Sequence, residues 1–312
     1  MKYAFLFPGQ GAQYVGMGKA LYDTCAMAKD TYRTANRVLG SDLAALCFEG
    51  DPEELKRTDQ CQPAIYVTAI ASWRVLVEQR AWRTPTAVAG LSLGEYAALT
   101  AAGAWSFEEG LQLVRVRGEA MEEAAQKTQG TMTAVFGLSR EEIERLCRES
   151  GAEVANLNSP GQIVVSGALE AITAVEGLAK TAGAKRIIRL DVSGAFHSAL
   201  MEPAARQMEE ALRRVEIKPL TVPLVSNVTA HLTTEPMQLR RNLVAQLTSP
   251  TLWADSMQRL IERGVTHFIE CAPGKVLSGL LKRIQPAVQA ATLNEPSEYA
   301  QLEAMLVTSG GG

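Results

Sequence analysis

Residues 86–105 read TAVAGLSLGEYAALTAAGAW. Small and β-branched residues at 87–89 predict a short strand, Gly90-Leu91-Ser92-Leu93-Gly94 predicts a tight turn, and the alanine- and leucine-rich remainder predicts a helix. A serine at the centre of such a turn is the nucleophile-elbow pattern G-x-S-x-G, in which the first N–H groups of the helix point at the hydroxyl. Ser92 is therefore a candidate nucleophile, and the alternative interpretation of a serine here is a plain helix N-cap.

Composition sets limits on the class of protein. The chain has 312 residues, 47% of them hydrophobic, with 31 basic against 34 acidic side chains. This nearly balanced charge gives no reason to expect a nucleic acid or a membrane as partner. The N-terminal apolar run stops at Pro8-Gly9, which is too short for a signal peptide, and the five scattered cysteines predict reduced thiols rather than a zinc site. We therefore expect a cytoplasmic protein without a metal.

The order of predicted elements indicates two domains in an α/β fold. Residues 131–192 alternate as βαββαβ, which is the ferredoxin-like arrangement. The segments on either side alternate strand and helix, which predicts a mostly parallel sheet covered on both faces. We therefore expect an α/β-hydrolase-like large domain over 1–127 and 195–312, and an inserted ferredoxin-like small domain over 128–194. Other elements are expected at 18–38 and 63–80 (helices) and at 185–192 and 220–227 (strands).

A second helix, which follows the elbow helix, carries an arginine on its apolar side. Ser106 and Glu109 form a capping box that starts this helix. Its apolar stripe is defined by residues at helical spacing, namely Leu111, Val114, Met121 and Ala125. Arg117 falls on that stripe, where a guanidinium needs an acceptor. That acceptor is either an internal carboxylate or a substrate anion, which arginine can bind through two N–H groups.

A glycine-rich loop follows the first apolar strand. Gly9-Gln10-Gly11 starts like a dinucleotide-binding fingerprint, but Tyr14 occupies the third glycine position. The two glycines instead indicate either a loop whose backbone approaches another group closely or a simple strand-to-helix connection.

A serine nucleophile needs a base, and the chain has three histidines. His267 falls within a predicted strand and His231 in a polar surface loop, whereas His197 lies in a loop at the expected domain junction, where clefts form. His197 is therefore the candidate base. Asp191 is close in sequence but makes no convincing third member of a triad.

Several motifs in series resemble one family. They are Phe7-Pro8-Gly9-Gln10-Gly11-Ala12-Gln13, Gly90-Leu91-Ser92-Leu93-Gly94-Glu95-Tyr96, Val116-Arg117-Gly118, Asn158-Ser159-Pro160-Gly161-Gln162, Ala195-Phe196-His197-Ser198-Ala199-Leu200-Met201 and Ala272-Pro273-Gly274-Lys275-Val276-Leu277. From about residue 3 to residue 295 the chain resembles malonyl-CoA:acyl carrier protein transacylases, which include the discrete enzyme of bacterial fatty acid synthesis and the acyltransferases of polyketide synthases.

The resemblance implies a ping-pong transfer through a Ser–His dyad. Ser92 would take the malonyl group from malonyl-CoA with His197 as general base, and the phosphopantetheine thiol of an acidic acyl carrier protein would then remove it. The backbone carbonyl of Gln246 would orient the imidazole, and the amides of Gln10 and Leu93 would form the oxyanion hole. No cofactor would be bound permanently.

The resemblance also implies residues that recognise the acyl donor. Arg117 matches the ligand of the malonate carboxylate, Met121 and Phe196 would line the acyl pocket, and Asn156 and Asn158 match positions near the substrate. Phe196, together with Leu93 after the nucleophile, favours malonyl over methylmalonyl by about 1–3 kcal/mol. Leu91 stands where most members have histidine, which predicts altered packing and no loss of mechanism.

Other functions remain open at this point. Ser92 and His197 would equally serve a thioesterase or another serine hydrolase, a discrete trans-acting polyketide acyltransferase fits the same motifs, and an idle binding module is the third class. The acidic carrier would need a basic patch, and its candidates are Arg240, Arg241, Lys275, Lys282 and Arg283. The oligomeric state is open, with a monomer as one expectation.

Overall fold

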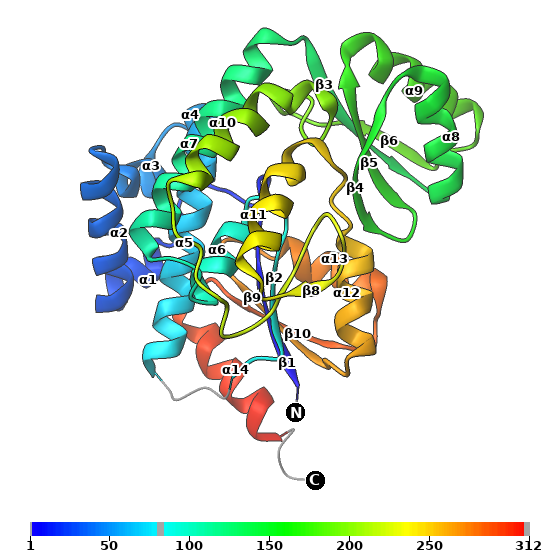
Figure 1. Ribbon diagram of the computed structural model, residues 1–312. Helices are drawn as coiled ribbons and strands as arrows, with labels where there is room; N and C mark the ends of the chain where they lie inside the picture. Colours follow the sequence, from blue (N-terminus) through cyan, green and yellow to red (C-terminus); the bar gives the residue numbers. More distant parts are fainter. Residues whose placement is uncertain (1, 80–83, 309–312) are drawn as a thin grey trace.

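The chain folds around two β-sheets, one above the other in Figure 1. The computed structural model describes residues 2–79 and 84–308. Residues 130–189, in green in Figure 1, form the smaller sheet and its helices, and the chain before and after them forms the larger sheet. No helix in these described ranges is long and apolar enough to cross a membrane.

The larger sheet has six strands in the order β10-β9-β1-β2-β7-β8. They are β10 (Gln289–Leu293), β9 (His267–Cys271), β1 (Tyr3–Phe7), β2 (Ala87–Gly90), β7 (Leu224–Val225) and β8 (Leu232–Thr233). Neighbouring strands pair in parallel, except that β8 is antiparallel to β7. The three central strands β9, β1 and β2 are buried along their whole length, as expected for a parallel sheet with both faces covered. This agrees with the expected α/β class.

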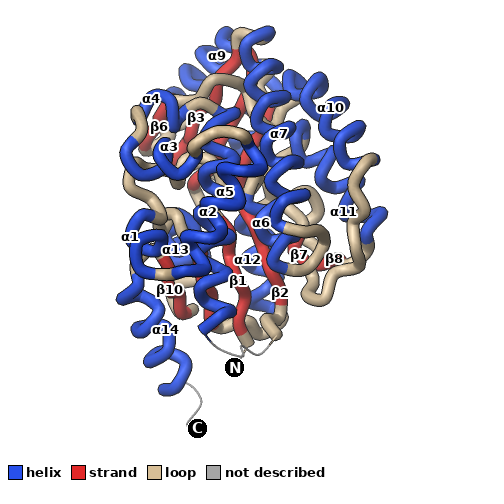
Figure 2. The backbone as a smooth tube through the Cα atoms, turned by 90° about the vertical axis from the view of Figure 1, so that its left-hand side faces the viewer, coloured by secondary structure: helices blue, strands red, loops and turns tan. Residues whose placement is uncertain are grey.

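Helices cover both faces of this sheet, and alternate residues of β1 mark the two sides. Phe5 and Phe7 face one apolar cluster, whereas Ala4 and Leu6 face the other. Most helices pack on the first side, and several of them lie in front of β1 and β2 in Figure 2. They are α1 (Lys19–Thr24), α2 (Ala26–Leu39), α3 (Leu43–Glu49), α4 (Pro52–Lys56), α5 (Thr58–Gln79), α6 (Gly94–Ala101), α7 (Phe107–Lys127), α10 (Glu202–Arg213), α11 (Pro236–Ala245) and α14 (Pro296–Thr308). The helices of the second side are α12 (Trp253–Glu262) and α13 (Val276–Ile284). There are also two 3₁₀ helices in this part of the chain: η1 (Ala199–Met201) precedes α10, and η2 (Gln246–Thr248) follows α11.

The smaller sheet has four strands in the order β4-β5-β3-β6, and all of its pairs are antiparallel. In chain order its elements are β3 (Gly130–Phe136), α8 (Arg140–Ser150), β4 (Glu153–Ser159), β5 (Gln162–Ala168), α9 (Leu169–Thr181) and β6 (Arg186–Arg189). Both helices pack on one face, where Ile143 and Ile172 belong to the same cluster. Met132 and Val164 on the other face join the main core, so this face is turned toward the larger sheet.

Several element boundaries differ from the sequence predictions, and a short break or a proline explains the first three. The helix expected at 18–38 is two helices that meet at Cys25. The helix expected at 63–80 begins earlier, at Thr58, because Pro63 is accommodated inside α5 rather than at its start. The strand expected at 220–227 shrinks to Leu224–Val225, since Pro223 has no N–H to donate to a neighbouring strand. The strand expected at 185–192 pairs only over Arg186–Arg189, and β10 and α14 were not predicted.

A buried carboxylate joins the centre of the sheet to α13. Glu270 on β9 is fully buried, and its two oxygens accept the backbone N–H groups of Leu277 (2.9 Å) and Ser278 (2.7 Å). These are free N–H groups of the first helical turn, which an anion satisfies well. Burial nevertheless raises the pKa of Glu270 to about 7.

Replacing Glu270 by glutamine is expected to change how stability depends on pH. Between pH 4.5 and 7 the folded protein holds a proton on Glu270 that the unfolded chain releases, so the free energy of unfolding falls as the pH rises through this window. The variant lacks this loss. From pH 4.5 to 7, the unfolding free energy of the wild type should therefore fall by about 3 kcal/mol relative to that of Glu270→Gln. Urea unfolding of both proteins at several pH values measures this, and parallel curves would contradict it.

Candidate active site

The elbow places Ser92 on a strained turn between β2 and α6. Its φ of 53° lies in the left-handed region, which side chains other than glycine rarely adopt. A Cβ on Gly90 would come within 2.0 Å of the Gly94 carbonyl carbon, and a Cβ on Gly94 within 2.1 Å of the Phe7 oxygen. Only glycine therefore allows this close approach at the two positions, as the motif predicted.

Asn227 holds the strained turn from the neighbouring strand. The Ser92 N–H donates to Asn227 Oδ1 at 2.7 Å, and Asn227 Nδ2 donates to the Gly90 carbonyl at 2.7 Å. Asn227 is buried and follows β7, the strand that pairs with β2. Sequence reasoning missed this residue, and its position at the end of a predicted strand beside the elbow was the one available signal.

His197 lies against the Ser92 hydroxyl. The His197 Nε2 to Ser92 Oγ distance is 2.8 Å, and Nδ1 lies 2.8 Å from the backbone oxygen of Gln246. A carbonyl oxygen can only accept a hydrogen bond, so it assigns the proton to Nδ1 and leaves the lone pair of Nε2 for the serine. This is the arrangement that a general base requires.

The surroundings keep His197 neutral. Its side chain is buried, and burial together with the positive charge of Arg117 lowers the pKa of His197 to about 4, although the hydrogen bond to Gln246 acts in the opposite direction. The free protein therefore carries an unprotonated imidazole at neutral pH.

This pKa predicts the acid limb of the reaction with an acyl-CoA donor. With His197 as the general base, the second-order rate constant for acylation of Ser92 should stay level between pH 5 and 7 and fall tenfold per pH unit below about 4, because only a neutral imidazole can accept a proton. Single-turnover acylation over this range, with an NMR titration of the imidazole as the direct check, measures it. An inflection near pH 6.5, the ordinary value for histidine, would contradict the prediction.

Arg117 reaches the same hydroxyl from α7. The guanidinium is 1% exposed, and Nη2 donates to Ser92 Oγ and to Gln246 Oε1, both at 3.0 Å, while Nη1 donates to Gln62 Oε1 at 2.7 Å. Its carbon lies 5.6 Å from the centre of the Tyr96 ring. Burial lowers the pKa of Arg117.

The internal salt bridge that the sequence left open is absent from the described residues. The side-chain oxygens that accept hydrogen bonds from Arg117 there belong to amides or to Ser92. The Tyr96 hydroxyl also interacts with the Arg117 side chain, but the buried Nε has no hydrogen-bond partner of acceptable geometry in these ranges. A donor is thus left over on a fully buried cation. Gln62 and the side chain of Gln246 were not foreseen in this role. Gln62 stands just before Pro63, in a stretch that was not expected to be helical.

These groups open into a cavity of about 180 Å³ between the two sheets. The candidate site residues that line it are Gln10, Ser92, Arg117, Met121, Asn156, Asn158, Phe196 and His197. Met132 and Val164 of the smaller sheet and Val276 and Leu280 of α13 complete the apolar wall. Leu93 and Gln246 are buried behind the lining.

Two backbone N–H groups near Ser92 have no partner in the described part of the chain. They belong to Gln10, on the loop after β1, and to Leu93, directly after the serine. Gly9 lets this loop approach the elbow closely, because a Cβ there would lie 2.3 Å from the Leu91 carbonyl oxygen. Of the two open interpretations of the Gly9-Gln10-Gly11 loop, the close approach is therefore the one observed.

The remaining candidates lie elsewhere. Asp191 is exposed and its carboxylate contacts Lys56 at 3.1 Å, His231 is exposed, and His267 sits in β9 with Nδ1 2.8 Å from Thr266 Oγ1. All five cysteines are free thiols, and the described ranges contain no group of three or more His, Cys, Asp or Glu that could hold a metal ion.

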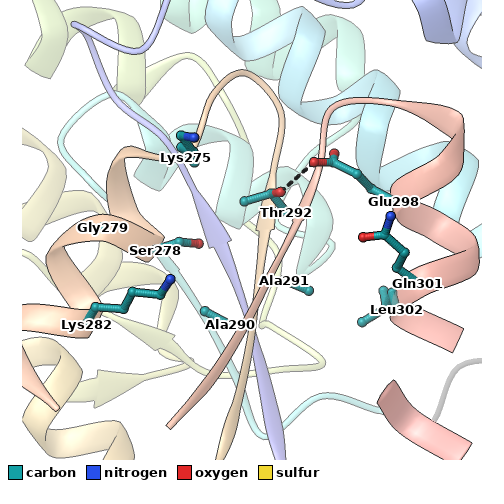
Figure 3. A pocket seen from close by; sticks show the side chains of 10 residues that line it. All are labelled: Lys275, Ser278, Gly279, Lys282, Ala290, Ala291, Thr292, Glu298, Gln301 and Leu302. Atoms are coloured by element: carbon teal, nitrogen blue, oxygen red, sulfur yellow. Dashed lines mark hydrogen bonds between the residues drawn. The ribbon is translucent and has the colours of Figure 1, made fainter. Parts of the chain in front are cut away.

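A second cavity, of about 500 Å³, lies apart from the dyad. It is bounded by α13, β10 and α14, and Figure 3 shows Lys275 and Lys282 on one side with Glu298 on the other, where Glu298 accepts from Thr292 at 2.8 Å. None of the candidate catalytic residues lines it.

The chain is similar to known proteins over almost its whole length. The acyl transferase domain family matches residues 4–295. The malonyl CoA-acyl carrier protein transacylase of Bacillus subtilis is 45% identical over 300 residues, which cover 95% of this chain and 94% of that protein. The enzyme of the same name from Escherichia coli is 41% identical over 303 residues, which cover 96% of this chain and 98% of that protein. A solved malonyl-transacylase in complex with a type II polyketide synthase acyl-carrier protein superposes with a TM-score of 0.94 at 38% identity, with 96% and 98% covered. The chain therefore belongs to the acyl transferase family and, within it, to the malonyl CoA-acyl carrier protein transacylases.

Proposed function

We propose that this protein transfers the malonyl group of malonyl-CoA to the phosphopantetheine thiol of an acyl carrier protein. The observation that carries the proposal is the buried guanidinium of Arg117, 3.0 Å from the Ser92 hydroxyl and with its Nε unpartnered among the described residues. An acyl group that ends in a carboxylate supplies the missing charge at the right distance from the nucleophile. A simple acyl group would leave this cation unsatisfied.

In the first half-reaction Ser92 takes the malonyl group. Its Oγ attacks the thioester carbonyl as His197 Nε2 accepts the hydroxyl proton, the carbon–sulfur bond breaks, and the proton passes to the sulfur of CoA. The negative charge on the carbonyl oxygen is stabilised by the N–H groups of Gln10 and Leu93. The product is a malonyl-serine ester and free CoA.

In the second half-reaction the carrier thiol takes the malonyl group. His197 removes the thiol proton, the sulfur attacks the ester carbonyl, and the carbon–oxygen bond breaks with return of the proton to Ser92. The Gln246 carbonyl keeps the imidazole in the required tautomer through both halves. It does so as a neutral acceptor, so the dyad needs no acidic third member.

The cavity wall selects the acyl group. Phe196 and Met121 are almost fully buried and apolar, so they leave little room for a methyl branch on the malonyl carbon. We assign Asn156 and Asn158, both on β4, to the amide groups of the pantetheine arm, because the buried Oδ1 of Asn158 lacks a partner in the described chain. Leu91 lines the same cavity and packs against the apolar cluster that contains Ala4 and Leu6 of β1, so its contacts support a packing role.

The test follows the acyl-enzyme by mass spectrometry. After incubation with malonyl-CoA, Ser92 should carry a malonyl group that persists in buffer and leaves on addition of the phosphopantetheine-bearing carrier. Release to water at the same rate without the carrier would support the alternative of a thioesterase or serine hydrolase. Acylation by malonyl-CoA followed by transfer to a fatty acid or a polyketide carrier would tell which pathway the enzyme serves.

We further propose that the two sheets mark two domains. The sheet order β4-β5-β3-β6 with α8 and α9 on one face supports a ferredoxin-like small domain over 128–194. The mainly parallel sheet with an elbow after β2 supports an α/β-hydrolase-like large domain over 1–127 and 195–312. The five free thiols support the cytoplasm as its compartment.

The docking face for the acidic carrier is proposed at the mouth of the reaction cavity. Lys185, Arg186 and Arg283 surround a hollow of about 380 Å³, and no carboxylate forms an ion pair with them in the described chain. Gln162 lines both this hollow and the reaction cavity, and it accepts a hydrogen bond from Arg283. Unbalanced positive charge that is continuous with the site suits an acidic protein that must deliver a thiol.

The other basic candidates fit this role less well. Arg240 donates to the backbone carbonyls of Leu212 and Val215, which uses it inside the fold. Arg241 bonds Gln238 on its own helix, and Lys275 and Lys282 line the separate cavity of Figure 3.

Charge reversal at this face is expected to affect the second half-reaction alone. In a Lys185→Glu/Arg186→Glu variant the KM for the carrier should rise roughly tenfold at low salt, because steering and rim contacts are lost. Acylation of Ser92 by malonyl-CoA should stay near the wild-type rate. Lys180→Glu, on α9 at the other face of the small sheet, is the matched control. An equal loss in acylation would assign these cations to the phosphates of CoA instead.

A further inference from the structure

We propose that Glu95 is a positioning residue of this site, which holds the Gln246 side chain and thereby fixes Arg117 relative to Ser92 and His197. The inference rests on the proposed function, in which Arg117 binds the malonyl carboxylate and the dyad performs the transfer.

Glu95 is a buried carboxylate beside the elbow. It lies in the first turn of α6, directly after Gly94, and is 1% exposed. Its Oε1 accepts the backbone N–H of Asn227 at 2.6 Å, and its Oε2 accepts Nε2 of Gln246. Both oxygens thus meet donors, which is the pattern that an ionised carboxylate satisfies best. Burial opposes ionisation and raises the pKa of Glu95 to about 8, while Arg117 pulls it in the other direction.

Each residue that Glu95 contacts holds a different part of the machinery. Asn227 binds the elbow on both sides of Leu91, through the Gly90 carbonyl and the Ser92 N–H. Gln246 binds His197 through its backbone carbonyl and Arg117 through Oε1. Glu95 is therefore connected to Ser92 through Asn227, and to His197 and Arg117 through Gln246.

The contacts of Gln246 have one consistent orientation. Arg117 can only donate, so Oε1 of the amide must face it, and Nε2 must then supply both of its hydrogens to acceptors. Those acceptors are the Ser92 carbonyl, at 3.0 Å, and Glu95. Gln246 is fully buried, so loss of Glu95 leaves a buried N–H without a partner and removes the restraint on the amide.

The separation between Glu95 and Arg117 explains why a carboxylate is tolerated so near the acyl site. A direct ion pair would compete with the substrate carboxylate for the guanidinium. Here the Gln246 amide lies between the two groups, because it donates to Glu95 through Nε2 and accepts from Arg117 through Oε1. The network therefore prepares Arg117 for an anion without occupying it.

The test is a double-mutant cycle on donor kinetics. Glu95→Gln keeps the size of the side chain but turns one accepting oxygen into a donor, and Gln246→Ala removes the amide but keeps the carbonyl that faces His197. Each single change should lower kcat/KM for malonyl-CoA about tenfold to a hundredfold, with a smaller loss for acetyl-CoA. The double variant should be no worse than the poorer single variant, because both changes break one connection.

Two further variants separate positioning from general stability. Glu95→Asp keeps a carboxyl group with two oxygens, so it should recover part of the malonyl rate. Glu270→Gln removes another buried carboxylate that accepts two N–H groups, and it should change Tm without changing the ratio of malonyl to acetyl transfer. The proposal is overturned if the fold losses in kcat/KM of the Glu95 and Gln246 variants multiply in the double variant. It is also overturned if Glu95→Gln lowers kcat/KM equally for malonyl-CoA and acetyl-CoA. If the wild-type enzyme forms no malonyl-serine, the proposed function fails instead.

Discussion

Changing Ser92 to alanine should abolish the malonyl adduct and lower turnover by about 10⁴-fold or more, the effect seen when a covalent nucleophile is removed. The structure gives two reasons. Ser92 Oγ lies 2.8 Å from His197 Nε2, within reach of a base, and the turn that presents this hydroxyl has no other nucleophile. Intact-protein mass spectrometry after incubation with malonyl-CoA, with steady-state transfer in parallel, measures both effects.

Two companion variants make this result specific. His197→Ala retains the hydroxyl, so a slow adduct should still form, because Arg117 donates to the same oxygen. Ser72→Ala removes a buried serine that donates to the Leu293 carbonyl, and neither residue lines the cavity, so Ser92 of this variant should be acylated at the normal rate. An adduct of unchanged amount on Ser92→Ala would move the nucleophile to another residue.

Changing Arg117 to alanine should invert donor preference. The rate constant kcat/KM for malonyl-CoA should fall about a hundredfold to a thousandfold, because the variant lacks the guanidinium that we propose to bind the substrate carboxylate. Acetyl-CoA has no carboxylate to lose, and its transfer should fall far less or rise. Competition between the two donors, with detection of both acyl-serines, measures the ratio directly.

Arg117→Lys tests geometry against charge. Lysine keeps the positive charge but cannot offer two N–H groups in one plane, nor reach Gln62, Gln246 and Ser92 at once. We expect it to recover only part of the malonyl rate. Because alanine leaves the amide oxygens of Gln62 and Gln246 without a donor, Tm is measured beside the kinetics. Equal losses for both donors would refute a carboxylate-binding role.

Local patterns in the sequence predicted much of this architecture. The elbow glycines, the Ser106–Glu109 capping box and the buried side of α7 all depend on spacing within one element, and the structure agrees with each. Arg117 could be placed on an apolar helix face for the same reason. These features need no knowledge of which strands pair.

The supporting residues depend on contacts between distant segments. Asn227 lies 135 residues from Ser92, and Gln62 lies 55 residues from Arg117, so no local period marks either of them. Glu95 and the side chain of Gln246, 151 residues apart, acquire their role only when β2 and β7 pair and bring α6 near η2. The position of Gln246 in the sequence followed from family resemblance, and its amide contacts follow from the structure alone.

The uncharged partner of His197 has a consequence for the lifetime of the acyl-enzyme. Burial and Arg117 lower the pKa of this imidazole to about 4, and the neutral carbonyl of Gln246 adds no negative charge that would raise its basicity as a carboxylate would. A thiol, with a pKa of about 8.5, needs little assistance, whereas water, at about 15.7, needs a great deal. In the proposed mechanism we therefore expect the carrier thiol to react with the acyl-enzyme much faster than water does, which would prolong the lifetime of the ester until the acceptor binds.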